Sequence, residues 1–315
     1  MARYEERIVG VINWANNALS APLHIERIDM MRKLNLRLTV NVTKTVAAFT
    51  DADPENPQSL IKRINVHANG RLPKSIRGEE LFVMNKINRG VAGERNPLAG
   101  NEATGTYNID CDLELNFQSI GMKPKALTNL ASWSFSSLFI EILWGTILDL
   151  TTDANAVINS ASVTVVAYYD KTNLSRLSAN IERNIIKDVV AANPQFQIDL
   201  DVGTLYRSFL IKSEDGASMR PVNNIINSVT LKMGDILIFD RVPWLQLQND
   251  NKYNYQAESW LDGYAIIDFP KKTGNWNRLL DARYTDTLKF FLDVNAGTAP
   301  QIVIHLTEIN ARYLL

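Results

Sequence analysis

Two segments of this chain alternate apolar and polar side chains so regularly that they predict half-buried β-strands. In residues 34–43, leucine or valine occupies every even position and a polar residue every odd one. Residues 107–118 repeat the pattern, with the apolar side chains at odd positions. Because successive side chains of a strand point to opposite faces of the sheet, each segment places one face in a core and the other in water.

Shorter strands are predicted where runs of apolar and β-branched residues are bounded by turn residues. They cover residues 61–68, 81–85, 137–144, 161–169, 196–202, 207–212, 228–233, 236–239, 244–248, 264–269, 287–294 and 301–309. Many alternating strands with few helices between them are typical of antiparallel sheets that pack face to face. The sequence therefore predicts an all-β protein.

Two segments show helical spacing instead. In residues 4–19 the apolar side chains fall on one stripe, and in residues 173–192 they recur at intervals of three and four. Asn193 and Pro194 follow the second segment as a stop signal. We therefore expect an N-terminal amphipathic helix and a linker helix, the latter where a boundary between two domains is expected.

The chain also carries a weak internal repeat on either side of the expected linker helix. Residues 60–70 align with 225–235, each with two apolar residues, two polar ones and then an alternation that runs into a turn. Residues 138–144 align with 288–294, and 162–167 with 301–306, in the same order. The repeat predicts two similar β-sandwiches, each large enough for the eight short strands of a jelly roll.

Composition excludes several classes of function. The chain has 315 residues, 33 of them basic and 34 acidic, for a net charge of −1. It therefore lacks the broad positive field that unaided binding to nucleic acid requires, and no specific nucleic-acid partner is expected. One cysteine and three histidines supply few metal ligands, and no phosphate-binding glycine motif occurs. We predict no catalytic residue, no cofactor and no bound metal.

The expected N-terminal helix, the strand and turn at residues 61–70, its counterpart at 226–235 and the closing strands at 286–293 and 301–309 together resemble a known family. They are similar to the double jelly-roll major capsid proteins of icosahedral, often membrane-containing viruses, in particular the short-looped members from corticovirus-like bacteriophages. The resemblance covers nearly the whole chain in architecture, but no segment of it is a diagnostic motif.

The resemblance implies a domain plan and a structural role in the virion. We expect an N-terminal helix and arm at 1–28, a first jelly roll at 29–172, a linker helix at 173–193 and a second jelly roll at 194–315. Three chains would form a capsomer in which six barrels give a nearly hexagonal outline. Such capsomers would tile an icosahedral shell around a genome, next to penton and minor capsid proteins and, in membrane-containing members, over an internal lipid membrane.

The N-terminal stripe is the main candidate site. Its apolar side chains could lie on an internal membrane, with the basic residues near lipid phosphates and the tryptophan at the level of the headgroups. Alternatively, the helix packs under its own barrel or against a neighbouring subunit. The candidate residues are Arg3, Tyr4, Arg7, Ile8, Val11, Ile12, Trp14 and Leu19.

Two other classes of function are weighed against the capsid interpretation. A tandem lectin-like, carbohydrate-binding module is the first, and its residues would be Trp244, Tyr253, Tyr255, Trp260 and Tyr264. A cupin-type enzyme is the second, although such a barrel normally binds its metal through clustered histidines.

Acidic residues offer two weaker candidates. Asp51, Asp53 and Glu55, and separately Asp199 and Asp201, alternate as ligands of a hard cation could. Paired carboxylates for acid–base chemistry could come from a second set, which is Asp110, Asp112 and Glu114. The polar face of a strand accounts for most of these residues.

Overall fold

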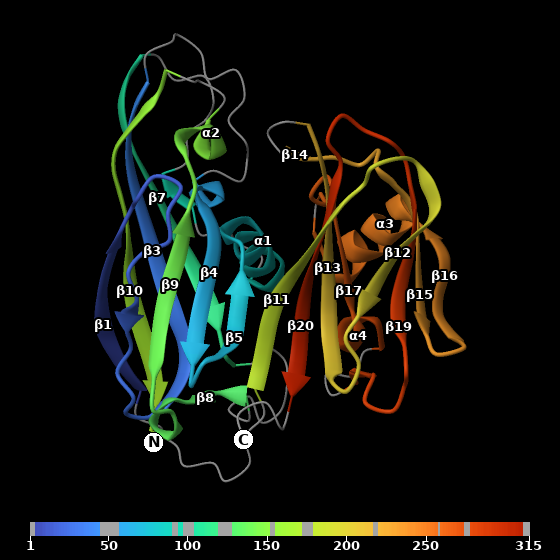
Figure 1. Cartoon of the computed structure of the whole chain (residues 1–315), viewed down its shortest axis with the longest axis horizontal. Helices are drawn as coiled ribbons and strands as arrows, with labels where there is room; N and C mark the ends of the chain where they lie inside the picture. Colours follow the sequence, from blue (N-terminus) through green and yellow to red (C-terminus); the bar gives the residue numbers. More distant parts are fainter. Residues whose placement is uncertain are drawn as a thin grey trace. The chain divides into compact units, whose positions relative to one another are not determined.

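The chain divides into two compact units. The computed structural model describes residues 4–44, 57–89, 94–96, 104–118, 128–151, 155–171, 179–216, 220–257, 259–273 and 278–310. Among the described residues the first unit runs to Asn180, and the second runs from Ile181 to Asn310. Figure 1 shows both units as layers of strands with a few short helices.

In the described part of the first unit, strands follow one another with a few helices and short helical turns between them. They are β1 (Tyr4–Asn13), β2 (Leu23–His24), β3 (Met30–Lys44), η1 (Gln58–Leu60), β4 (Ile61–Ala68), β5 (Arg71–Ile76), α1 (Gly78–Arg89), β6 (Glu94–Asn96), β7 (Gly105–Asn116), β8 (Leu130–Ala131), η3 (Ser132–Ser134), β9 (Leu138–Trp144), α2 (Ile147–Leu150) and β10 (Val157–Asp170).

Strand β11 leads into the second unit, whose elements follow in order. They are β11 (Ala179–Asp188), β12 (Asn193–Leu200), β13 (Leu205–Asp215), β14 (Arg220–Pro221), β15 (Ile226–Met233), β16 (Ile236–Pro243), α3 (Trp244–Asn254), β17 (Tyr264–Asp268), α4 (Phe269–Thr273), β18 (Leu280–Asp281), β19 (Leu288–Val294) and β20 (Gln301–Asn310).

The first unit is a sandwich of two antiparallel layers. One layer has the order β1-β10-β3-β7-β6, with β8 pairing to β3, and the other has β5-β4-β9-β2. The long alternation at 34–43 lies on β3, where every even residue is buried, and the alternation at 107–118 lies mostly on β7. Both are confirmed. Their apolar side chains pack toward those of β4 and β9 because only the inner face of each layer excludes water.

The second unit repeats this design. One layer has the order β14-β13-β20-β11, with β17 and β18 also pairing to β13, and the other has β12-β19-β15-β16. A continuous apolar core lies between the layers and includes Phe209, Phe290 and Leu306. The rings of Phe209 and Phe290 meet edge to face with centroids 5.2 Å apart, which is a favourable geometry for aromatic pairs.

The two units share one order of strand pairing, which is that of a jelly roll. Strands β1, β2, β3, β4, β5, β7, β9 and β10 correspond in turn to β11, β12, β13, β15, β16, β17, β19 and β20. The aligned segments of the sequence repeat fall on β4 with β15, β9 with β19, and β10 with β20. The chain is a double jelly roll, as the sequence predicted.

The predicted N-terminal helix is wrong, because residues 4–13 form strand β1, which pairs with β10 (Figure 1). Apolar residues at 4, 8 and 12 suit a helix, but in the strand Ile8 is exposed and Ile12 is buried, so these two lie on opposite faces. A register shift between Ile8 and Gly10 breaks the period of two and hides the strand signal. The segment is therefore the first strand of the first jelly roll.

The predicted linker helix is wrong as well. Residues 179–188 form strand β11, and residues 193–200 form β12. Ile181 and Ile185 stand four apart and so share one face of the strand. Residues 172–178, where the expected helix would begin, lie outside the described residues. By its place in the strand order, β11 is the first strand of the second jelly roll.

Two predicted strands are helices. Residues 81–85 lie in α1 and residues 244–248 in α3. A short apolar run does not distinguish a strand from a buried stretch of helix. In α3 the buried residues are Trp244, Leu247, Gln248 and Asn251, a helical spacing that becomes visible only over a longer window.

Candidate interaction surfaces

Strand β1 is an edge strand with apolar side chains on its exposed face. It is the last strand of its layer among the described residues. Ile8 is 76% exposed and Val11 is 53% exposed, whereas Ile12 is only 4% exposed and belongs to the core. Of the predicted apolar stripe, Ile8 and Val11 therefore remain available for a partner. A helix would have carried all of these side chains on one side.

Arg7, the basic residue of the predicted site that the structure describes, forms ion pairs with carboxylates. Arg7 contacts Glu5 at 2.5 Å and also forms an ion pair with Glu26, while Lys171 contacts Glu5 at 3.1 Å. Hydrogen bonds from Lys171 and Arg7 lower the pKa of Glu5, and the bond to Glu5 raises the pKa of Arg7. Arg7 is thus engaged within its own unit.

The remaining members of the site differ in their placement. Tyr4 begins β1, where it pairs with Asp170, and Arg3 lies outside the described residues. The backbone of Trp14 donates to Ala161 on β10, and its indole donates to the Gly145 carbonyl at 3.1 Å. Trp14 therefore ties β1 to the start of the loop after β9.

Leu19 also connects the segment after β1 to the other layer of the first unit. It forms an isolated bridge with Leu143 on β9, although its side chain is exposed. Next to it, Ser20 donates its backbone N–H to the carbonyl of Ile142 at 2.8 Å. The predicted residues thus do not form one surface: Trp14 has a structural role, Ile12 is core, and Ile8, Val11 and Leu19 are exposed.

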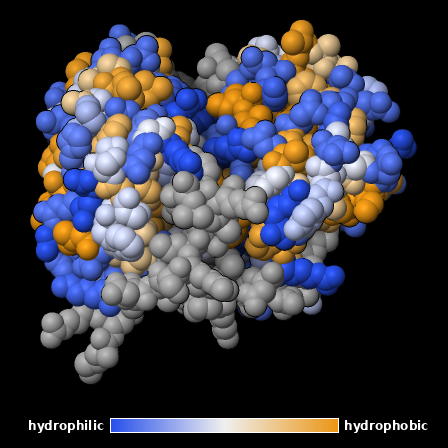
Figure 2. Space-filling view, turned by 60° about the horizontal axis from the view of Figure 1, so that its bottom comes forward, coloured by the Kyte–Doolittle hydropathy of each residue, from blue (hydrophilic) through white to orange (hydrophobic). Residues whose placement is uncertain are grey.

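A second apolar edge lies on β16, the last strand of its layer in the described part of the second unit. Ile236 is 61% exposed and Leu237 is 53% exposed, so both faces of the strand carry uncovered apolar side chains. Sequence reasoning predicted a strand here but not its exposure, because an edge strand and a central one can share the same apolar run. Figure 2 shows apolar side chains in scattered patches between hydrophilic ones on the face in view.

Most of the acidic candidates are paired or lie outside the described chain, and Asp110 stands on β7 opposite Thr39 of β3. Glu114 forms an ion pair with Lys33, and Asp112 lies 3.4 Å from Arg37. Asp199 contacts Lys289 at 3.3 Å, and Asp201 contacts Arg183 at 2.5 Å. The loop with Asp51, Asp53 and Glu55 is not among the described residues. Within the described ranges, no group of three or more histidine, cysteine or carboxylate side chains is placed to hold a metal ion.

The aromatic residues of the lectin-like alternative do not gather on one surface. Trp244 and Tyr264 are buried in the second unit, whereas Tyr253 is exposed. Trp260 donates its indole N–H to the carbonyl of Tyr264 at 2.8 Å. Tyr255 donates to Asp268 at 2.7 Å, and burial together with that carboxylate raises the pKa of Tyr255.

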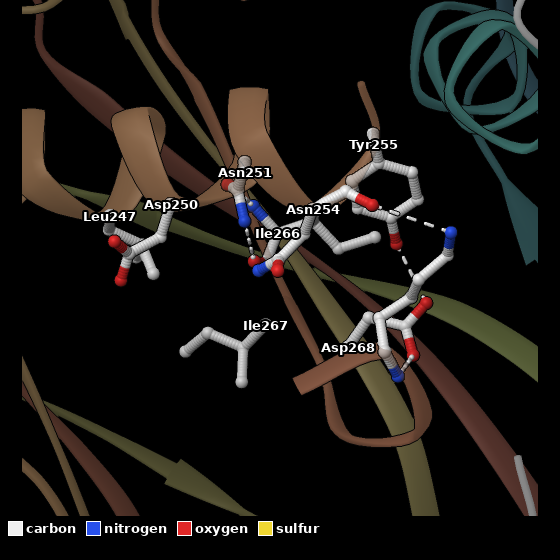
Figure 3. Close-up of a pocket in the computed structure, with 9 residues that line it drawn as sticks. Leu247, Asp250, Asn251, Asn254, Tyr255, Ile266, Ile267 and Asp268 are labelled. Atoms are coloured by element: carbon white, nitrogen blue, oxygen red, sulfur yellow. Dashed lines mark hydrogen bonds between the residues drawn. The ribbon is translucent and has the colours of Figure 1, made fainter. Parts of the chain in front are cut away.

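The small cavity beside Tyr255 has room for water only. Figure 3 shows it between α3 and β17, with Asn251 bonded to the backbone of Ile266 and Tyr255 bonded to Asp268. Its volume is about 20 Å³, which is close to what one water molecule needs.

In the described residues no helix is long and apolar enough to span a bilayer.

Comparison with known proteins relates the chain to viral capsid proteins by fold. No protein-family model and no curated protein sequence matches it. Among solved structures, the major capsid protein of Sulfolobus turreted icosahedral virus is 17% identical, with a TM-score of 0.80 over 99% of this chain and 98% of that one.

Two further solved structures of viral capsid proteins share the fold. The major capsid protein P2 of bacteriophage PM2 is 16% identical, with a TM-score of 0.62 over 99% of both chains. The capsid protein of the virus PBCV-1 is 9% identical, with a TM-score of 0.68 over 98% of this chain and 94% of that one. The chain therefore has the double jelly-roll fold of these major capsid proteins along nearly its whole length.

Proposed function

We propose that the protein is the major capsid protein of an icosahedral virus. The observation that carries the proposal is the pair of jelly rolls in one chain, matched over nearly full length by viral major capsid proteins. Its role is structural rather than catalytic. It resides in the virion, is assembled in the host cytoplasm, and contacts neighbouring capsomers, penton proteins and minor capsid proteins.

We further propose that three chains form the capsomer, so that six jelly rolls complete one ring. A ring needs a heterologous contact, in which two different surfaces of each chain meet. The chain offers two such surfaces, the exposed edges of β1 and β16. An uncovered edge with apolar side chains favours pairing with another chain, and Ile8 and Leu237 would lie in that contact.

The placement of β1 favours the inter-subunit role of the N-terminal residues over the membrane role. Ile12 is used by the core, and Arg7 is engaged by Glu5 and Glu26. Of the candidate residues whose side chains the structure describes, Ile8, Val11 and Leu19 are the exposed apolar ones that could enter a bilayer. An internal membrane beneath the shell would then be reached by other parts of the virion or by residues outside β1.

Negative-stain electron microscopy of the purified protein tests the capsid function. We expect capsomers with a nearly hexagonal outline and larger closed or sheet-like assemblies at high protein concentration. Vesicle flotation tests the membrane role separately, and we expect the protein to stay unbound. Single particles of one chain, without larger assemblies under any condition, would refute the capsid role and leave the lectin-like module as the better account.

A further inference from the structure

A polar trough crosses the outer face of the β12-β19-β15-β16 layer in the second unit. It has a volume of about 470 Å³, within the range of about 300–1,000 Å³ that is common for small-molecule sites. All four strands or their flanks contribute to it. Its lining residues are Pro194, Gln195, Ser228, Thr230, Asp240, Arg241, Phe291 and Asp293.

The floor of the trough comes from two central strands. Phe291 on β19 pairs with Thr230 on β15, and Asp293 pairs with Ser228, so these four side chains stand together on one face. All four are half-buried. The opposite face of the same strands is core, where Phe290 and Leu292 are buried. The floor is therefore held by a well-packed layer.

Both walls are formed where an outer strand is irregular. On β12 the register shifts between Asn193 and Phe196, so Pro194 and Gln195 stand beside Asp293. On β16 the register shifts next to Thr230, whose hydroxyl accepts the backbone N–H of Arg241 at 2.9 Å. Bulges of this kind redirect side chains and are frequent beside binding sites.

Arg241 also has a strained backbone. Its φ is +46°, in the left-handed region that side-chain-bearing residues rarely adopt. Such a conformation costs about 1 kcal/mol or more and persists where the surrounding structure requires it, often at functional sites. Here the strain places an arginine on the wall of the trough, where glycine would satisfy the backbone better.

The charged side chains of the trough lack partners within the described part of the chain. The carboxylates of Asp240 and Asp293 and the guanidinium of Arg241 form no hydrogen bond or ion pair there, in contrast to the paired Asp199 on the same layer. Together with Gln195 and two hydroxyls, they present donors and acceptors of both kinds around one aromatic ring.

We propose that this trough binds a saccharide. A simple ion would need charges of one sign, whereas Asp240, Asp293 and Arg241 mix both. A sugar ring presents vicinal hydroxyls that donate and accept at once, and an apolar C–H face that suits the negative face of an aromatic ring such as Phe291. The site goes beyond the proposed capsid function and does not depend on it, because a capsid can form without binding a glycan.

The test is a glycan array probed with the purified full-length protein, followed by calorimetry with each oligosaccharide that binds. We expect binding that Asp293→Asn weakens about tenfold or more, because a carboxylate hydrogen bond to a hydroxyl is lost or weakened. Asp286→Asn is the matched control, since Asp286 is an exposed carboxylate of the same unit outside the trough. It should leave the affinity unchanged.

Arg241→Gly gives an independent readout. It relieves the left-handed strain, so we expect a higher melting temperature together with weaker glycan binding. Absence of any glycan that binds, or binding that Asp293→Asn and Arg241→Gly leave unchanged, would overturn the proposal. The proposal would also be overturned if these variants lost their trimers and no glycan bound. That result would assign the trough to contacts between copies of the chain. Capsomers that form normally without glycan binding would refute the saccharide site alone.

Discussion

Asn85 of α1 and Asn251 of α3 make the same pair of hydrogen bonds, each with one residue of a later strand in its own unit. Asn85 donates to the carbonyl of Glu114 at 2.9 Å and accepts its N–H at 2.7 Å. Asn251 donates to Ile266 at 2.6 Å and accepts at 2.8 Å. Each asparagine stands seven residues after the first residue of its helix.

This shared contact fixes each helix to its own sandwich. A side-chain amide has the same donor and acceptor as a peptide group, so it can satisfy the open edge of a strand without adding another strand. Glu114 is on β7 and Ile266 on β17, which occupy the same place in the strand order of their units. The internal repeat therefore extends to a single hydrogen-bonded side chain.

Replacing either asparagine should destabilise its unit. Asn85→Leu or Asn251→Leu leaves a buried N–H and a buried carbonyl without partners, which we expect to cost about 2–4 kcal/mol in the free energy of unfolding. Urea denaturation measures the change. Asn249→Leu on the exposed side of α3 is the control, and we expect less than about 0.5 kcal/mol. Equal losses for Asn249 and Asn251 would contradict the role of the contact.

Two glycines separate backbone strain from steric overlap. Gly263 has φ +72°, and a Cβ there would lie 2.5 Å from the backbone nitrogen of Val222. Gly203 has φ +89° but open space around it. We expect Gly203→Ala to cost about 1 kcal/mol and Gly263→Ala about 2–4 kcal/mol. Thermal unfolding of both variants checks this, and a Gly263 variant as stable as the Gly203 variant would be inconsistent with the packing described.

Acid should weaken the link between β13 and the loop before β20. The backbone N–H of Ala299 donates to Asp215 at 2.8 Å, and this bond lowers the pKa of Asp215 below its usual 3.8. A lowered pKa in the folded state means that the stabilisation is complete above the ordinary value and is lost as the pH falls through the folded one.

Melting temperatures measured from pH 6 to pH 2.5 test this linkage. At neutral pH, Asp215→Asn should melt at a lower temperature than the wild-type protein, because its free energy of unfolding is lower by about 1 kcal/mol. The difference from the wild-type protein should shrink below pH 4, because protonated aspartate also loses its charge. A constant difference over the whole range would show that the charge of Asp215 makes no contribution.

Substitutions on the two exposed edges should separate assembly from folding. Ile8→Lys and Leu237→Lys place a charge where we propose that chains meet, and burying an unpaired charge costs several kcal/mol. We expect each to weaken the trimer about tenfold or more and to change the stability of the single chain by less than about 0.5 kcal/mol.

The control for these variants is Val190→Lys. Val190 is 96% exposed and lies outside both edge strands. Sedimentation velocity compares the three proteins at matched concentrations. If Val190→Lys weakens the trimer as much as the edge variants do, the contact does not depend on β1 and β16.

The sequence predicts the strands that are buried on one face and long enough to show their period. Residues 34–43 and 107–118 are such strands, and the aligned segments on β9 and β19 show the same burial alternation. The first strand of each unit is not predicted, because residues 4–13 and 179–188 carry apolar residues four apart. That spacing fits a helix and a strand equally, and only the pairing with β10 or β20 decides between them.

The candidate surfaces are harder to predict than the fold. Exposure of Ile8 and Leu237 depends on which strand ends a layer, and the trough depends on two irregular registers beside Asp293 and Thr230. The local pattern of residues predicts neither the exposed edges nor the irregular registers. The Asn85 and Asn251 contacts are likewise invisible in the sequence, since each joins a helix to a strand in a separate part of its unit.

The mass of the purified protein in solution tests the central claim most directly. Sedimentation velocity over a range of concentrations should give a species of three times the 35.5 kDa of one chain, with larger assemblies as the concentration rises. A single species of one chain at every concentration, with the fold intact, would contradict the account.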